Sequence, residues 1–106
     1  MPPYKVVISD AAREMLMERV YFLATVNPTA AEALRKKMMG EIRSLAKMPE
    51  RFPYLEPNNR KSRYRKMYVP NWYLVIYTVE NDTVFVEYIL DCRQNEGSYR
   101  FLLHTD

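Results

Sequence analysis

The side chains best suited to chemistry are basic and tyrosine residues between positions 60 and 68. Tyr64 and Tyr68 lie in or just after a stretch that contains no acid. A cationic stretch of this kind attracts a polyanion or an acidic protein segment, and tyrosine rings can stack on bases. The alternative is a solvated basic stretch that protects an edge strand, with tyrosines that only pack on the sheet. The cations in this stretch are Arg60, Lys61, Arg63, Arg65 and Lys66.

The remaining reactive groups are few, and they exclude several kinds of site. His104 is the only histidine, and it lies close to the C-terminal end, where we expect an exposed residue rather than a catalytic base. With Cys92 as the only thiol, a zinc site, a nucleophilic triad and an internal disulfide are all disfavoured. Two glycines, Gly40 and Gly97, are too few for a glycine-rich phosphate loop. No metal or cofactor is therefore expected.

Length and composition favour one small domain spanning residues 1–106. Hydrophobic residues make up 48% of the 106 positions, which is ample for one core but not for two. The single cysteine and the absence of a signal peptide indicate the cytoplasm, and the longest apolar runs are too short to cross a bilayer. The formal net charge of +3 is modest. The basic stretch is notable because it concentrates positive charge in one part of the chain.

These candidate groups must be positioned by a run that alternates like three consecutive antiparallel strands. The central strand is apolar on both faces, as expected where one face is covered and both edges are paired. Pro70-Asn71 ends the first strand, and Asn81-Asp82 suits a tight turn because both residues tolerate positive φ. The three strands are expected at Tyr64–Val69, Tyr73–Val79 and Val84–Leu90.

The N-terminal half predicts a short strand over residues 4–9 followed by a helical hairpin. Apolar residues recur every three or four positions within Asp10–Val26, with Ser9 or Asp10 as N-cap and Asn27 at the end. A second helix begins at Asn27-Pro28, or at Thr29 with a Thr29/Glu32 capping box, and stops at Pro49. The helical stripes are expected to bury, among others, Phe22, Met15, Met38 and Met48.

Two segments lack a periodic pattern. Residues 49–62 contain three prolines and read as a long loop, pinned to the core by Phe52, with Tyr54 as a second anchor. Residues 98–103, SYRFLL, are apolar, so we expect them to pack back on the sheet or to bind a partner.

The predicted fold is α+β: an N-terminal strand, then an antiparallel helical hairpin packed on a three- to four-stranded antiparallel sheet.

The chain resembles the RelE/ParE toxin superfamily of bacterial type II toxin–antitoxin systems over nearly its full length. The resemblance is closest to the ParE-type, plasmid-stabilisation branch. It implies a small cytoplasmic toxin neutralised by a cognate antitoxin whose extended segment wraps around it. The segments that carry the resemblance are, in order, YKVVIS, NPTAAEAL, SLAKMPERFP, YRKM and YLVIYTVENDTVFVEYILDCRQ.

The resemblance implies two activities. RelE-like members cleave messenger RNA on the ribosome, and the catalytic set that this implies is Arg65, Arg93 and Tyr99, with Lys66 beside it. Cations would stabilise charge on the scissile phosphate while other groups transfer protons. However, the central-strand arginine of these nucleases aligns with Leu74, which cannot hold a phosphate. Arg93 could equally form a salt bridge with a nearby acid at the end of the sheet.

ParE-like members instead poison DNA gyrase, and the YLVIY strand favours this branch. In this interpretation the basic stretch contacts gyrase, nucleic acid or an acidic antitoxin segment, and it does so through Arg60, Lys61, Arg63, Arg65 and Lys66. The preferred function is therefore a gyrase-directed toxin. A ribosome-dependent mRNA endoribonuclease and a non-toxic antitoxin-binding module remain as alternatives.

Overall fold

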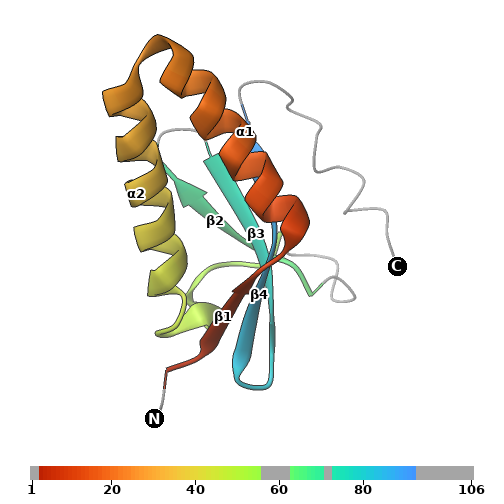
Figure 1. Ribbon diagram of the computed structural model, residues 1–106. Helices are drawn as coiled ribbons and strands as arrows, with labels where there is room; N and C mark the ends of the chain where they lie inside the picture. The colour runs from red at the N-terminus through yellow and green to blue at the C-terminus, as the bar shows by residue number, and fades with distance from the viewer. Residues whose placement is uncertain (1–2, 56–62, 71–72, 93–106) are drawn as a thin grey trace.

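The computed structural model describes residues 3–55, 63–70 and 73–92 (Figure 1). Two antiparallel helices form one layer and a four-stranded sheet forms the other, so the predicted α+β architecture is confirmed. The elements are β1 (Lys5–Ile8), α1 (Asp10–Val26), α2 (Pro28–Ser44), a short 3₁₀ helix η1 (Pro49–Arg51), β2 (Arg65–Val69), β3 (Tyr73–Glu80) and β4 (Thr83–Asp91).

The sheet has the order β1-β4-β3-β2. The meander β2-β3-β4 is antiparallel as predicted, whereas β1 joins it parallel to β4. The helical hairpin explains this direction, because it returns the chain to the end of the sheet where β1 begins. There the Tyr4 amide donates to the Ala46 carbonyl at 2.8 Å. Strand β2 therefore starts from the same end as β1, and the third strand of a meander runs in the direction of its first.

Local capping chemistry sets the helix boundaries. The Ser9 hydroxyl accepts from the Ala12 amide at 2.9 Å and donates to the Glu87 carbonyl at 2.8 Å, which ties the start of α1 to β4. Asn27 ends α1 and caps α2 by accepting from the Ala30 amide at 3.0 Å. Of the two predicted starts of the second helix, the one at Asn27-Pro28 is observed.

Strand β3 is buried on both faces, as predicted. Its odd-numbered residues face the helices and belong to the main core with Leu16, Met38 and Ile42. On the other face Leu74 and Ile76 form a second cluster, and neither side chain is exposed. The Asn81-Asp82 turn is also confirmed, with Asn81 at a φ of 56°.

Three expectations about buried side chains are wrong. Phe22 is 61% exposed because the buried arc of α1 is narrower than expected, and the Arg19 guanidinium lies over its ring. Met48 is 74% exposed because it adopts a φ of 52° after α2 has ended, so it does not continue the helical stripe. Phe52 packs on the core as predicted, but the second anchor of the loop is Leu55, not Tyr54. Residues 56–62 of the predicted loop and the tail from 93 lie outside the described residues.

The two hydrogen bonds of Ser9 predict a measurable cost when its hydroxyl is removed. Ser9→Ala should lower the free energy of unfolding by about 1–2 kcal/mol, because the substitution deletes an N-cap together with a bond to β4. Urea unfolding measures this change. Thr25→Ala is the control, because that hydroxyl bonds only within an exposed helix end, and it should change stability by less than about 0.5 kcal/mol. Equal effects of the two substitutions would contradict the assignment.

Candidate interaction site at strand β2

The basic stretch does not form a single exposed surface. Arg65 and Lys66 are adjacent in β2, so their side chains point to opposite faces of the sheet. Arg65 shares the face of the buried Met67 and its side chain is only 13% exposed. Arg63 precedes the strand and its side chain is 71% exposed. Arg60 and Lys61 lie outside the described residues.

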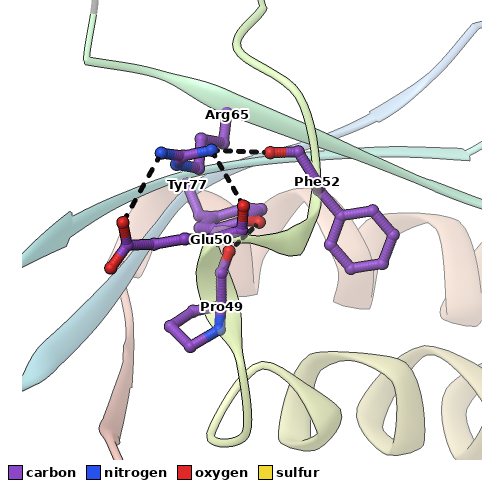
Figure 2. Close-up of polar contacts among 5 residues, drawn as sticks. All are labelled: Pro49, Glu50, Phe52, Arg65 and Tyr77. Atoms are coloured by element: carbon purple, nitrogen blue, oxygen red, sulfur yellow. Dashed lines mark hydrogen bonds and ion pairs between the residues drawn. The ribbon is translucent and has the colours of Figure 1, made fainter.

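Backbone carbonyls surround the Arg65 guanidinium (Figure 2). Its Nη1 donates to the Phe52 carbonyl at 2.7 Å and to the Glu50 carbonyl at 3.2 Å. Its Nη2 lies 3.9 Å from the Glu50 carboxylate, and the Tyr54 ring stacks at 4.1 Å from the guanidinium carbon. Arginine suits this place because its planar fork presents several donors at once. Arg65 therefore holds residues 50–54 against the start of β2.

Tyr77 of β3 holds the same turn through a hydrogen bond to its first proline. It is the register partner of Arg65 on β3, its side chain is fully buried, and its hydroxyl donates to the Pro49 carbonyl at 2.6 Å (Figure 2). Burial raises the pKa of the Tyr77 phenol to about 12, while the charges of Arg65 and Arg51 oppose this shift. The phenol is therefore a neutral hydrogen-bond donor throughout the physiological pH range.

A second arginine connects the same turn to the end of α2. Arg51 Nη1 donates to the carbonyls of Lys47 at 2.6 Å and Met48 at 3.1 Å, and Nη2 donates to the Ser44 hydroxyl at 2.9 Å. The Ser44 hydroxyl lies at the C-terminal end of α2 and the two carbonyls lie just beyond it, where the helix dipole also favours a cation. Arg51 and Arg65 thus fix the turn of residues 48–54 from both sides.

The segment after this turn covers the outer edge of β2. The Lys66 amide donates to the Pro53 carbonyl at 3.0 Å, and the Leu55 amide donates to the Tyr64 carbonyl at 2.8 Å. These bonds form an isolated bridge between Tyr54 and Arg65. An edge strand whose backbone groups are paired in this way is protected from pairing with other chains. The loop therefore protects the edge of β2 through backbone hydrogen bonds, in addition to the charges that the sequence analysis suggested.

Two tyrosines are the exposed side chains of the site, and the partly buried Lys66 lies beside one of them. Tyr54 is on the side of Arg65, whereas Tyr68 and Lys66 are on the opposite face of β2. Tyr68 is 60% exposed and Tyr54 is 45% exposed, and the Lys66 ammonium lies 5.9 Å from the Tyr68 ring centre. No carboxylate of the residues that the structure describes lies within ion-pair distance of Lys66. Arg63, by contrast, is paired with Glu80 across the β2–β3 edge. Among the described cations of the basic stretch, Lys66 is thus the one without a carboxylate partner.

The other candidate groups do not join this site within the described residues. Leu74, at the position of the nuclease arginine, is fully buried in the cluster with Leu55 and Leu90. Arg93 and Tyr99 lie outside the described residues, as does His104. In residues 3–55, 63–70 and 73–92, no group of three or more histidine, cysteine or acidic residues could hold a metal ion.

Sequence reasoning missed the groups that organise this site. Arg51 and Tyr77 were not candidates, because they donate to backbone carbonyls, which have no residue-type signal. Glu50 was missed as well, because its contact with Arg65 joins residues far apart in the sequence. It also missed a groove of about 520 Å³, lined by Pro3 and Tyr4 on one side and by residues 46–50 on the other. The only available signal was the MPERFP segment, whose prolines mark a constrained turn.

Comparisons with known proteins identify a family and a solved structure that are similar to this chain. A family model described as "ParE toxin of type II toxin-antitoxin system, parDE" matches residues 6–96. Among solved structures, a chain described as "Chromosomal ParDE TA system from P. aeruginosa" is similar, with a TM-score of 0.68 and 10% identity. The match covers 81% of this chain and 92% of that one, and at this identity it shows the fold alone. None of the curated proteins compared with the chain is a detectable relative.

Within the part of the chain that the structure describes, no helix is long and apolar enough to cross a membrane.

The contacts of Arg65 predict that it stabilises the fold far more than Arg63 does. Arg65→Met keeps the apolar stem but removes charged hydrogen bonds to two carbonyls, so it should cost about 1.5–3 kcal/mol of unfolding free energy. Arg63→Met is the matched control and should cost less than about 1 kcal/mol, because its ion pair is exposed to solvent. Urea unfolding of both variants tests this difference. A cost for Arg65→Met as small as that of Arg63→Met would contradict the structural role.

The raised pKa of Tyr77 predicts a loss of stability at alkaline pH. The folded state holds the phenol proton more tightly than the unfolded chain does, so this stabilisation is complete below pH about 10 and is lost as the pH approaches about 12. Between about pH 8 and about pH 11 the loss from this group should be about 1.4 kcal/mol. Urea unfolding of the wild type and of Tyr77→Phe at both pH values isolates it. An equally steep loss in Tyr77→Phe would show that other groups are responsible, such as Tyr64, whose pKa is also raised by burial.

Proposed function

The chain belongs to the ParE toxin family of type II toxin–antitoxin systems, and from this premise we propose that it arrests growth by inhibiting DNA gyrase. The target implies action in the cytoplasm, where gyrase meets the chromosome. The proposed activity requires no metal and no cofactor from this chain. Inhibition would occur by binding, through surface groups that contact the enzyme or its DNA.

The burial of Leu74 is the observation that carries the choice of target. In the RelE-like nucleases that the chain resembles, an arginine at this position of the central strand serves phosphate chemistry. Here an aliphatic side chain with no exposed surface lies against Ile76 and Leu90. It can neither contact a phosphate nor stabilise charge on it. This supports a toxin that acts by binding rather than by cleaving RNA.

The contact surface that we propose is the exposed side of β2. Lys66 presents a partly exposed cation beside the accessible ring of Tyr68. Arg60, Lys61 and Arg63 would add positive charge to the same part of the chain. For Arg65 we propose a positioning role, since its guanidinium is bound to the carbonyls of residues 50 and 52. The cationic contact is therefore narrower than the basic stretch in the sequence.

We also propose that a cognate antitoxin neutralises the protein through an extended segment with both apolar and acidic residues. Its acids would approach Lys66 and its neighbours, while its apolar residues would cover a groove or face of the two-layer fold. Solvent-exposed charge contacts weaken with added salt, whereas apolar contacts do not. The affinity of the complex should therefore fall as the salt concentration is raised. The part of the affinity that comes from apolar contacts should remain.

The proposal predicts that the purified protein inhibits gyrase and leaves messenger RNA intact. Supercoiling of relaxed plasmid by gyrase should fall with increasing toxin, and ribosome-stimulated transcript cleavage should be absent in a parallel assay. Lys66→Glu should weaken inhibition at least about tenfold, because it reverses a partly exposed charge at the proposed contact. Its unfolding midpoint should be unchanged. The matched control is Lys37→Glu on α2, which lies in the helical layer and should inhibit normally.

Two outcomes would overturn the proposed target, and a third would reject only the contact surface. Transcript cleavage with gyrase unaffected would favour the ribosome-dependent nuclease. In that case Arg93→Ala should relieve growth arrest without changing thermal unfolding, whereas a gyrase inhibitor should remain toxic with this substitution. If inducing the protein had no effect on growth, it would be a non-toxic antitoxin-binding module. Full inhibition by Lys66→Glu would reject the contact surface while leaving the target in place.

A further inference from the structure

The outer face of helix α2 carries a stripe of positive charge. Met38 and Ile42 are fully buried and mark the inner face of this helix. Lys36, Gly40 and Arg43 follow one another at spacings of four and three residues, so they lie together on the opposite face. All three are exposed to solvent. We call these three residues the α2 stripe.

The acids of α2 do not neutralise the α2 stripe. The helix contains two acids, and each is held by a cation beside the stripe, Glu32 by Arg35 at 2.6 Å and Glu41 by Lys37 at 3.1 Å. Within residues 3–55, 63–70 and 73–92, neither cation of the stripe has a carboxylate at ion-pair distance. The stripe therefore presents two charges that the described fold does not use.

Gly40 separates these two charges, and the fold gives no reason for a glycine there. A Cβ added at this position would meet no atom within 4 Å, and the φ of Gly40 is not positive. Glycine inside a helix is less stable than alanine because it loses more backbone freedom on folding. The missing side chain instead leaves room for an outside group to approach the helix between the two cations.

The spacing of the two charges fits the backbone of a nucleic-acid duplex. Lys36 and Arg43 are seven residues apart, which is about 10 Å along the helix axis. One strand of duplex DNA carries a phosphate about every 3.4 Å of its axis. Both cations can therefore reach one duplex backbone at the same time. Lys47, which is also exposed, follows three residues after the end of α2 and extends the positive charge.

The remaining chemistry of this face favours a duplex over other polyanions. Helix α2 has no aromatic residue, so it offers no ring on which the bases of a single strand could stack. None of the large hydrophobic side chains exposed in the described residues belongs to α2, so apolar residues of an acidic peptide would find no anchor. Charge and close access are what sequence-independent contact with a phosphate backbone requires.

We propose that the α2 stripe binds the phosphate backbone of duplex DNA without reading its sequence. This surface is separate from the exposed side of β2, and the binding requires neither gyrase nor an antitoxin. The inference thus goes beyond the proposed function. A toxin held loosely on DNA in this way is concentrated where enzymes that act on DNA are found.

The anisotropy of a short labelled duplex tests this binding as the salt concentration is varied. The wild type should bind with a dissociation constant of roughly 10⁻⁴ to 10⁻⁶ M. Replacing both Lys36→Gln and Arg43→Gln should weaken binding at least about tenfold at about 50 mM salt. The slope of log affinity against log salt should become shallower by about 2. The matched control, Lys5→Gln with Arg13→Gln, removes two exposed charges from β1 and α1 and should change neither quantity.

Substitutions of Gly40 test the close approach. Gly40→Gln should raise the unfolding midpoint, because glutamine is a better helix former and its side chain has free space. It should nevertheless weaken duplex binding at least about threefold, because the longer side chain holds the phosphates away from the cations. Gly40→Ala is the control for helix stability, and it should stabilise the fold with a smaller loss of affinity. Unchanged affinity of Gly40→Gln would contradict the approach at this residue.

NMR of the wild type needs no substitution. Adding the duplex should shift the amide resonance of Gly40 and leave that of Thr25, at the exposed end of α1, unchanged. The absence of a shift at Gly40 would overturn the proposal. So would equal losses of affinity in the two double variants, because net charge alone would then explain binding.

The choice of partner is tested by competition. Single-stranded DNA, duplex RNA and polyglutamate should each displace the labelled duplex less effectively than unlabelled duplex DNA does. Stronger displacement by any of them would reject duplex DNA as the partner. None of these measurements uses gyrase, so a loss of DNA binding with inhibition of supercoiling intact would reject this inference and leave the proposed function standing.

Discussion

The burial of β3 on both faces is the constraint on which the rest of the structure depends. A strand in this position needs neighbours at both edges and a layer on each side, because its apolar side chains alternate between two environments. Strands β2 and β4 provide the edges, and the helical hairpin provides one layer. On the other face, Leu74 and Ile76 pack with Leu55 and Leu90. Almost every element of this small domain thus serves to remove one strand from water.

The turn between α2 and β2 shows how polar groups complete the same task. Residues 48–54 cross from the helical layer to the edge of the sheet and bring several backbone carbonyls into partly buried positions. Such carbonyls need donors, and Arg51, Arg65 and Tyr77 supply them. Arg65, one of the cations of the predicted binding surface, is therefore structural, and so is Arg51. Charge in a sequence does not reveal whether it faces solvent or a carbonyl.

This division changes the interpretation of the basic stretch. Its alternating pattern separates Arg65, which fixes the fold, from Lys66, which stays available beside Tyr68. A toxin that acts by contact needs only a small accessible charge on a rigid support, and the bonded turn makes β2 such a support. The buried Leu74 excludes from its position the phosphate chemistry that the resemblance to nucleases would otherwise suggest. Both features agree with a binding toxin of the ParE family.

The sequence by itself determined the two helices, the three-stranded meander and most of their boundaries, because these follow from local periodicity and capping. The end of the second helix is an exception, since α2 stops at Ser44 and not at the predicted Pro49. Ser9, Asn27 and the Asn81-Asp82 turn were each in the predicted place. Only the tertiary structure decided that β1 lies parallel to β4, that Met48 is exposed and that Arg65 is bound internally. These outcomes depend on where the chain returns after α2, and that path is set by backbone carbonyls and long-range packing, which no residue type encodes.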